Sequence, residues 1–265
     1  KVNEMTRFFC ENGEYRIANH ILHDHKPHSW LTFREVIELS SNIGTSKVAQ
    51  LLGPQTLYEY IKAFGFGSKL GVDMPGEING SIKPPRQWSK TSIACVPMGQ
   101  EVGVTALQLA SAVSVIANGG YLMKPYLVKE VRDRQGQVIE EYPPTTMRRV
   151  ISEETAARMR KILTGVMETG TGKMGKLDQF TAAGKSGTAQ KLEPNGTYSH
   201  DKYIASFIGF APAEDPQVAI VVTIDEPRGY YFGGVVAAPV FKRVAEDVLK
   251  YLKTREYTQQ AVSVR

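Results

Sequence analysis

The residues best suited to chemistry in this 265-residue chain form a short polar run from Gly184 to Thr188. The run reads Gly-Lys-Ser-Gly-Thr and lies inside a strand-like segment that could line a cleft. There the ammonium of Lys185 and the hydroxyls of Ser186 and Thr188 would present positive charge and hydrogen-bond donors to a carboxylate. Gly187 has no side chain, which lets a substrate backbone approach the strand edge. An ordinary surface strand could carry the same residues, so the run gains meaning only with a partner motif.

The same run does not fit a phosphate-binding loop. Such a loop ends in Gly-Lys-Ser or Gly-Lys-Thr and needs a second glycine five positions before that final glycine. Here that position is Gln179, and the segment is patterned as a strand, not as a loop that opens a helix. The upstream Gly172-Lys173 pair fails in the same way, because Met167 stands at the required position. The phosphate-loop interpretation is therefore rejected.

A second polar motif, Ser40-Ser41-Asn42, separates two segments with helical spacing. A turn between helices can aim one hydroxyl and one amide into a cleft, so that Ser40 relays a proton and Asn42 orients a carbonyl. Serine and asparagine are also ordinary caps at helix junctions. Taken alone, the motif is interpreted as a cap, and only its combination with the Lys185 run makes it a candidate for catalysis.

The elements that must position these motifs are helices followed by a late sheet. Apolar residues recur at helical spacing in the first part of the chain, and strand-like runs near its end are separated by turn residues. The short connections between these late strands predict antiparallel neighbours. The predicted fold class is α/β of the α+β kind, an antiparallel sheet flanked by helices. Helices are predicted at 33–37, 48–52, 56–63, 105–117, from 152 onward and at 238–252, and strands at 14–17, 126–131, 138–142, 180–192, 203–211 and 218–224.

Composition and charge exclude several classes of protein. Apolar residues make up 42% of the chain and charged residues 22%, which excludes a disordered chain and a collagen. The longest apolar stretches are too short to span a bilayer. Lysine and arginine number 32 against 27 acidic residues, a net charge of +5, but they are spread along the chain without a dense run. No nucleic-acid partner is therefore predicted.

The cysteines and histidines do not indicate a metal or a cofactor. Cys10 and Cys95 lie far apart in sequence, so either one disulfide or two buried thiols is compatible with them. Four histidines lie between His20 and His28, but structural zinc requires closer, paired spacing of its ligands. No metal and no cofactor is predicted.

In this order and spacing, the two motifs resemble the Ser-x-Asn and Lys-Thr-Gly motifs of the penicillin-binding proteins and β-lactamases. The chain is most similar to the transpeptidase domain of a class B penicillin-binding protein, the kind used in cell division or elongation. The resemblance covers nearly the whole chain, and the collinear order of its pieces makes it specific. The further pieces are 24–31, 63–67, 73–77, 98–100, 105–110, 117–120, 170–172 and 183–190.

The resemblance implies a D,D-transpeptidase that cross-links peptidoglycan stem peptides through a serine acyl-enzyme. Ser40 would shuttle the proton towards the leaving amine, and Lys185 would supply the electrostatic field for that step. Asn42 would bind the acyl-side amide. Ser186 and Thr188 would hold the terminal carboxylate of the substrate, next to Gly187, and the Thr188 N–H would form half of an oxyanion hole.

The resemblance also implies the setting of the domain. The fold would be penicillin-binding/β-lactamase-like, with its N-terminal part truncated, a transpeptidase domain over residues 1–253 and a C-terminal tail over residues 254–265. The partners would be peptidoglycan stem peptides, β-lactam antibiotics and other cell-wall synthesis proteins. The location would be extracytoplasmic, either periplasmic or at the outer face of the cytoplasmic membrane, with an anchor outside this chain.

One element of the family pattern is missing. The family places its nucleophile in a Ser-x-x-Lys motif upstream of Ser-x-Asn, whereas the only match here is Ser199-His200-Asp201-Lys202, which lies downstream of Lys185. We interpret this match as a chance one. The nucleophile is expected before Lys1, and the 265-residue chain alone is expected not to form an acyl-enzyme.

Two alternative functions remain open at this point. The first is a catalytically inactive sensor or scaffold that binds penicillin or wall peptide, which the missing Ser-x-x-Lys motif keeps open. The second, less favoured, is a serine β-lactamase, which needs an acidic residue for deacylation. Glu153, Glu154 and Glu168 belong to the long helix predicted from residue 152, which leaves Glu101 as a candidate.

Overall fold

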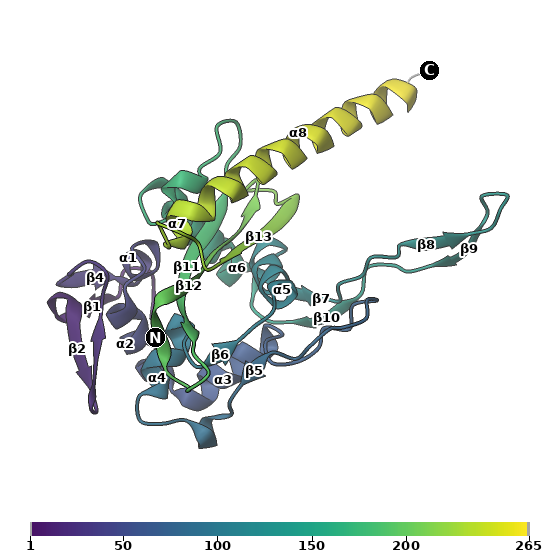
Figure 1. Ribbon diagram of the computed structural model, residues 1–265. Helices are drawn as coiled ribbons and strands as arrows, with labels where there is room; N and C mark the ends of the chain where they lie inside the picture. Colours follow the sequence, from purple (N-terminus) through teal and green to yellow (C-terminus); the bar gives the residue numbers. More distant parts are fainter. Residues whose placement is uncertain (1, 264–265) are drawn as a thin grey trace.

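A three-stranded antiparallel sheet carries the Gly184–Thr188 run in the computed structural model, which describes residues 2–263 and the side chains of residues 2–254 (Figure 1). Its strands are β11 (Ala183–Leu192), β12 (Tyr198–Ala211) and β13 (Val218–Asp225), in the order β11-β12-β13. This confirms the three predicted antiparallel strands, although β11 begins three residues after the predicted start at residue 180.

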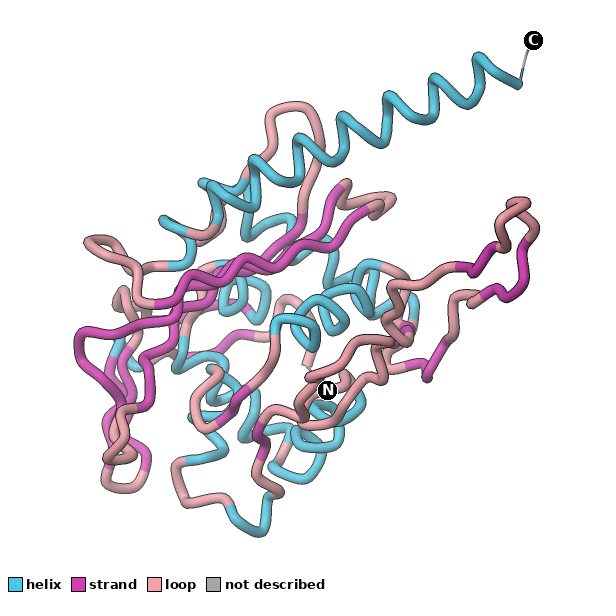
Figure 2. Tube along the Cα trace, turned by 45° about the vertical axis from the view of Figure 1, so that its right-hand side comes forward, coloured by secondary structure: helices cyan, strands magenta, loops and turns pink. Residues whose placement is uncertain are grey.

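Helices cover both faces of this sheet. On one face, α8 (Ala238–Ser263) packs Phe241, Ala245 and Leu249 against Phe207 of β12. On the other face, α5 (Ala106–Ala117) and α6 (Glu153–Glu168) pack against Phe210 of the same strand. Consecutive side chains of a strand alternate between faces, so β12 contributes to both cores. The result is a helix–sheet–helix arrangement in which β11 lies at the edge of the sheet formed by the described residues (Figures 1 and 2).

The N-terminal part of the chain builds the opposite wall around Ser40. The helices α1 (Phe33–Glu38) and α2 (Asn42–Leu52) confirm the predicted helix–turn–helix. Phe8, Val36 and Ile43 form their core with neighbouring apolar residues. Thr32 begins α1 in a capping box with Glu35, which satisfies two free N–H groups of the helix. Four short strands complete this part: β1 (Arg7–Phe9), β2 (Glu14–Ile17), β3 (His20–His23) and β4 (Trp30–Thr32).

The remaining elements connect these two walls. The helix α3 (Pro54–Ala63) and the predicted hairpin, formed by β8 (Glu130–Arg132) and β9 (Val138–Glu141), are both present. The hairpin projects away from the body (Figure 2). Besides β1, β3 and β4, the short elements not predicted from the sequence are β5 (Ser81–Ile82), β6 (Val102–Gly103), β7 (Tyr121–Met123), β10 (Thr146–Arg149), α4 (Ser92–Cys95), α7 (Gly233–Val236) and the 3-10 turns Glu11–Gly13, Pro85–Gln87, Val96–Met98 and Lys173–Gly175.

The C-terminal helix is longer than predicted. It was expected to end at Leu252, but α8 continues to Ser263 and projects beyond the body (Figure 1). The predicted domain end at residue 253 therefore falls inside a continuous helix, and the side chains of the predicted tail beyond residue 254 lie outside the described residues. Within residues 2–263, no helix is both long enough and apolar enough to cross a membrane.

Candidate active site

Ser40 follows α1 in a backbone conformation that usually requires glycine. Its φ is +59°, its N–H donates to the Ile37 carbonyl at 3.3 Å, and the Ser41 N–H donates to the Val36 carbonyl at 3.0 Å. These two bonds close the helix in the manner of a Schellman motif, whose left-handed position is most often glycine. A side chain at this position costs about 1 kcal/mol. The exposed Ser40 side chain thus occupies a position where the backbone conformation alone would favour glycine.

The start of α2 is fixed by Ser41 and by Asp24. The Ser41 hydroxyl accepts from the Gly44 N–H at 2.9 Å and donates to Asp24 Oδ2 at 2.7 Å. Asp24 Oδ1 accepts from the Ile43 N–H at 3.0 Å, so this carboxylate also satisfies a free N–H of the helix start. Asn42 donates from Nδ2 to the His23 carbonyl at 2.9 Å, which orients its amide. The turn therefore serves as a cap through Ser41, while Ser40 and Asn42 are left for other contacts.

Lys185 lies against Ser40. Its Nζ donates to Ser40 Oγ at 2.7 Å and to the Ser186 carbonyl at 3.1 Å, although Ser40 and Lys185 are 145 positions apart in sequence. Burial lowers the pKa of Lys185 to about 8, because the charged ammonium loses its hydration. A hydroxyl held by a lysine that titrates near neutral pH can pass a proton in an acyl transfer.

Ser186 and Thr188 are each held by a second segment. The hydroxyls of Thr171 and Ser186 are hydrogen-bonded at 2.8 Å. Thr188 Oγ1 accepts from the Gly233 N–H at 3.0 Å, which leaves the Thr188 hydroxyl proton available to a ligand. The hydroxyls of Ser186 and Thr188 thus lie in fixed positions along the edge strand β11.

The turn from Gly170 to Gly172 joins the two walls of the site. The Thr171 N–H donates to the Glu38 carbonyl at 3.3 Å, two residues before Ser40, while the Thr171 side chain contacts Ser186. A Cβ on Gly234 at the start of α7 would overlap the Thr171 carbonyl oxygen, so this glycine allows the close approach. Thr171 and Gly234 thus couple the position of the Ser40 turn to that of β11.

A family model described as the penicillin-binding protein transpeptidase domain matches residues 1–246. The chain belongs to this family. Stage V sporulation protein D of Bacillus subtilis is 39% identical over 235 residues, which cover 88% of this chain and 36% of that protein. A probable peptidoglycan D,D-transpeptidase, PenA of Neisseria flavescens, is 37% identical over 241 residues, 90% of this chain and 57% of that protein. The penicillin-binding domain thus spans about a third to just over half of these curated relatives.

Solved structures agree with this assignment. The apo transpeptidase domain of penicillin-binding protein 3 from Burkholderia pseudomallei superposes with a TM-score of 0.84 at 33% identity, covering 95% of this chain and 73% of that one. Penicillin-binding protein 3 of Mycobacterium tuberculosis, in complex with aztreonam, superposes with a TM-score of 0.84 at 32% identity, covering 96% of this chain and 58% of that one. The predicted fold class and family are confirmed.

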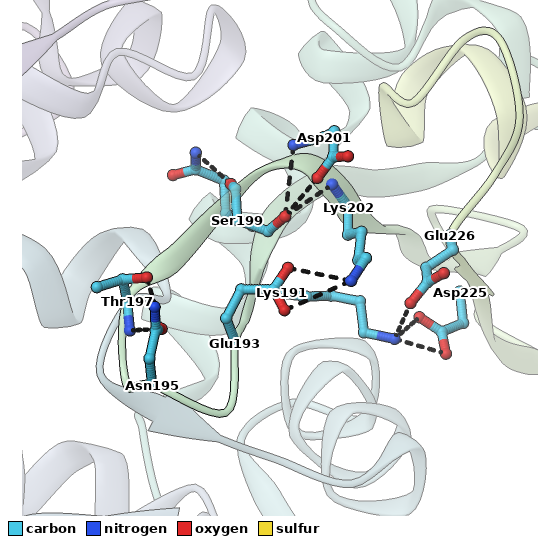
Figure 3. Close-up of polar contacts among 10 residues, drawn as sticks. Lys191, Glu193, Asn195, Thr197, Ser199, Asp201, Lys202, Asp225 and Glu226 are labelled. Carbon is cyan, nitrogen blue, oxygen red and sulfur yellow. Dashed lines mark hydrogen bonds and ion pairs between the residues drawn. The ribbon is translucent and has the colours of Figure 1, made fainter.

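Ser199 and Lys202 of this penicillin-binding domain do not form a nucleophile–base pair (Figure 3). The buried Ser199 hydroxyl donates to Asp201 Oδ1 at 2.7 Å and accepts from the Lys202 N–H at 3.2 Å, which is the pattern of a local turn. Lys202 Nζ is directed instead to Glu193 at 3.2 Å. This geometry agrees with the interpretation of Ser199-x-x-Lys202 as a chance match.

Other candidate groups of the sequence have structural partners. Glu101 accepts from Ser92 Oγ at 2.6 Å through its carboxylate. Cys10 and Cys95 are free thiols, so the disulfide left open by the sequence is absent. Among the described residues, no group of three or more histidine, cysteine, aspartate or glutamate side chains is arranged to hold a metal. His25 packs against Phe232 with 4.7 Å between ring centroids.

Asp24, Thr171 and Gly234 are the positioning residues that sequence reasoning did not identify. Asp24 and Thr171 belong to segments that carry the family resemblance, but nothing in their spacing indicated which side chain each would contact. Gly234 lies outside those segments. A pattern of residue types does not reveal a contact that depends on how the elements pack.

Proposed function

We propose that this domain catalyses peptidoglycan D,D-transpeptidation. The observation that carries the proposal is the 2.7 Å hydrogen bond from Lys185 to Ser40, which joins the two motifs of the sequence in one site. The 2.8 Å bond between Ser186 and Thr171 supports it, because it places a hydroxyl of the same strand in a fixed position. The names of the relatives, which include a probable peptidoglycan D,D-transpeptidase, point the same way.

The reaction begins when a serine oxygen attacks the penultimate D-alanine carbonyl of a stem peptide. Ser40 passes the serine proton to the leaving amine as the carbon–nitrogen bond breaks, and the terminal D-alanine departs. The charge of Lys185 favours this transfer and attracts the substrate carboxylate. Asn42, with its amide oriented by the His23 carbonyl, binds the acyl-side amide. The amine of a second stem peptide then takes the acyl group and releases the serine.

The edge strand β11 holds the substrate. Ser186 and Thr188 donate their hydroxyl protons to the terminal carboxylate, and the Thr188 N–H stabilises the oxyanion of the tetrahedral intermediate. Gly187 leaves room for the peptide backbone, which adds to the sheet as a further strand. β-Lactams would occupy the same site as mimics of the stem peptide. The complex with aztreonam of the Mycobacterium tuberculosis relative supports this assignment.

We propose that the serine nucleophile lies in a Ser-x-x-Lys segment that precedes residue 1 of this chain in the full-length protein. The proposal rests on the order of the motifs, because the one Ser-x-x-Lys match in these 265 residues follows Lys185. Its hydroxyl is engaged by Asp201 and not by a lysine ammonium. The full-length protein is this chain together with the upstream segment.

We also propose the limits and setting of the domain. Residues 1–253 form the domain and residues 254–265 a tail, because Leu249 is the last α8 residue in the described core and Lys253 lies 5.8 Å from the Phe180 ring. The domain acts outside the cytoplasm, where its substrate is, and the full-length protein is anchored in the membrane. It works with other cell-wall synthesis proteins, for which the projecting β8–β9 hairpin, with Val138 and Ile139 exposed, offers a surface.

The test is the release of D-alanine from a stem pentapeptide by the full-length protein, with an acceptor amine present. Lys185→Ala is expected to lower the rate about 100-fold or more, since proton-transfer and charge effects of this kind amount to 10²–10⁴. Lys191→Ala is the matched control, because Lys191 lies on the same strand but is paired with Asp225 and Glu226. A full-length protein that binds penicillin without releasing D-alanine would be a sensor or scaffold, and the proposal would be wrong.

A further inference from the structure

A basic cavity lies apart from the Ser40–Lys185 site. It has a volume of about 390 Å³ and is formed by the end of α3, the turn that follows it, and β10, elements that Figure 1 places below and beside the sheet. None of its lining residues belongs to the candidate active site. The lining residues with charged side chains are Glu59, Lys62, Lys69 and Arg148.

The head groups of Lys62 and Arg148 are held in place by backbone carbonyls and by the Ser68 hydroxyl. Lys62 Nζ donates to the Gly67 carbonyl at 2.7 Å and to Ser68 Oγ at 2.6 Å. Arg148 donates from Nε to the Ala63 carbonyl at 2.8 Å and from Nη2 to the Lys62 carbonyl at 3.0 Å. These bonds leave Nη1 of Arg148 and one ammonium hydrogen of Lys62 without a protein acceptor among the described side chains.

The three cations have no acidic partner among the described side chains. Glu59, the one carboxylate of the lining, accepts from Gln55 at 2.8 Å. The three positive charges and one negative charge of the lining leave a net charge of +2. Burial, and to a lesser degree the charge of Arg148, lower the pKa of Lys62, so the cations repel one another across the cavity. An anion bound between them would relieve this repulsion.

We propose that this cavity binds a phosphate group. A phosphate dianion matches the net charge of the lining, and its oxygens can accept from an arginine and from lysine ammonium groups together. Lys62 and Lys69 come from one segment and Arg148 from another nearly 80 residues later, so the fold brings the three cations together. Charged side chains that are only solvated at a surface would not require this arrangement. The group could be carried by a soluble phosphorylated molecule or by a phospholipid head group, since both present the same chemistry.

The first experiment titrates the full-length protein with inorganic phosphate and with pyrophosphate by calorimetry, at low and at high salt. Saturable binding is expected, and it should weaken as salt is added because the contacts are ionic. Lys69→Gln is expected to weaken binding about tenfold or more, the size of one lost charge-assisted hydrogen bond. Within residues 2–254, the side chain of Lys69 forms no hydrogen bond or ion pair, so this variant should fold normally.

The controls separate this cavity from general surface charge. Arg134→Gln removes the same charge at the tip of the β8–β9 hairpin and should leave phosphate affinity unchanged. Arg148→Gln keeps a side-chain N–H donor for the α3 carbonyls and should weaken phosphate binding as Lys69→Gln does. The proposal is overturned if no saturable binding occurs, or if Lys69→Gln binds phosphate as tightly as the parent and the Arg134→Gln control.

Vesicles distinguish the two sources of the phosphate group. The vesicles contain phosphatidylglycerol, with phosphatidylcholine vesicles for comparison, and the protein is added with and without Lys69→Gln. A Lys69-dependent preference for phosphatidylglycerol assigns the site to a lipid head group. Phosphate and pyrophosphate binding that depends on Lys69, without such a vesicle preference, assigns it to a soluble ligand. Either result supports a phosphate site.

Discussion

At the scale of single residues, Ser40 has a hydroxyl that contacts Lys185 and a backbone conformation that costs free energy. A left-handed residue at the end of α1 would be glycine if stability alone decided its type. The hydroxyl that contacts Lys185 explains why a side chain is present there. The hydroxyl is thus held in a defined place, and the helix end is less stable than it would be with glycine at this position.

Substitution of Ser40 separates these two effects. Ser40→Gly and Ser40→Ala both remove the hydroxyl, so both should slow penicillin labelling of the full-length protein about 100-fold. Ser40→Gly should nevertheless be about 1 kcal/mol more stable than Ser40→Ala, because glycine adopts positive φ without steric cost. Urea unfolding measures the difference. Equal stability of the two variants would show that the conformation at residue 40 carries no such cost.

Lys185 predicts a pH dependence of ligand capture. With its pKa lowered to about 8, the side chain is charged below that pH and neutral above it. A ligand carboxylate is attracted by the charged form, so the rate of acylation by benzylpenicillin should fall as pH rises through about 8. Lys185→Arg, which stays charged above pH 12, should remove the fall. A rate that is flat from pH 7 to 9 in the parent would contradict this assignment.

The lowered pKa of Lys185 also predicts that the stability of the fold rises with pH, whereas the rate of acylation falls. The unfolded lysine keeps its proton up to about pH 10.5, whereas the folded one loses it near pH 8. Between these values the unfolded chain binds more protons, so the free energy of unfolding should rise with pH. Lys185→Met should therefore stabilise the fold more at pH 7 than at pH 10.5, as measured by urea unfolding. A pH-independent difference between variant and parent would be inconsistent with a buried charge at Lys185.

The sequence alone identified the candidate residues, but it did not identify the residues that contact them. Ser40 and Lys185 belong to motifs whose types and order can be read directly. Thr171 was visible only as part of a Gly-Thr-Gly segment, because its contact with Ser186 arises from packing across the site. The roles proposed for Asn42 and Thr188 remain predictions from the resemblance.

At the scale of elements, the turn at 170–172 and the start of α7 set the spacing of the two walls. Gly234 lies against the Thr171 carbonyl oxygen, and a methyl group there would have to displace backbone atoms. Backbone atoms move less readily than the ends of side chains, so overpacking is costly at this point. These elements hold β11 and the Ser40 turn together.

Gly234→Ala should therefore destabilise the domain by about 2 kcal/mol and slow penicillin labelling of the full-length protein. Gly103→Ala is the matched control, because a Cβ there would lie 3.5 Å from Ser81 Cβ, an ordinary contact. Urea unfolding and the rate of labelling measure the two effects. If Gly234→Ala behaves like Gly103→Ala, the turn and α7 do not fix the spacing of the site.

Long elements were predictable and short ones were not. The bounds of the strand β13 and the helix α5 follow from periodicity that extends over several residues. Strands of two or three residues, such as β1 and β5, have too few positions to show alternation. The end of α8 was misplaced because the apolar stripe ends near Leu252, whereas the helix continues without one. Apolar periodicity reports packing, and a helix can extend beyond its packed part.

At the scale of the whole molecule, the described residues provide two walls of a site, but the serine of the Ser-x-x-Lys match is not placed as its nucleophile. Lys185 and Ser40 face each other across the walls, while Ser199 is bonded within its own turn. The relatives are longer than this chain, which covers 36% of the sporulation protein and 57% of PenA. The proposed transpeptidase mechanism therefore uses a serine that the upstream segment would supply.

Mapping the covalent penicillin adduct tests this account most directly. The full-length protein is incubated with benzylpenicillin, digested, and analysed by mass spectrometry to locate the modified peptide, with Lys185→Ala treated in parallel. The adduct is predicted on a serine before residue 1, within a Ser-x-x-Lys sequence, and it should be strongly reduced in Lys185→Ala. An adduct on a serine within residues 1–265, such as Ser199, or no adduct at all, would contradict the account.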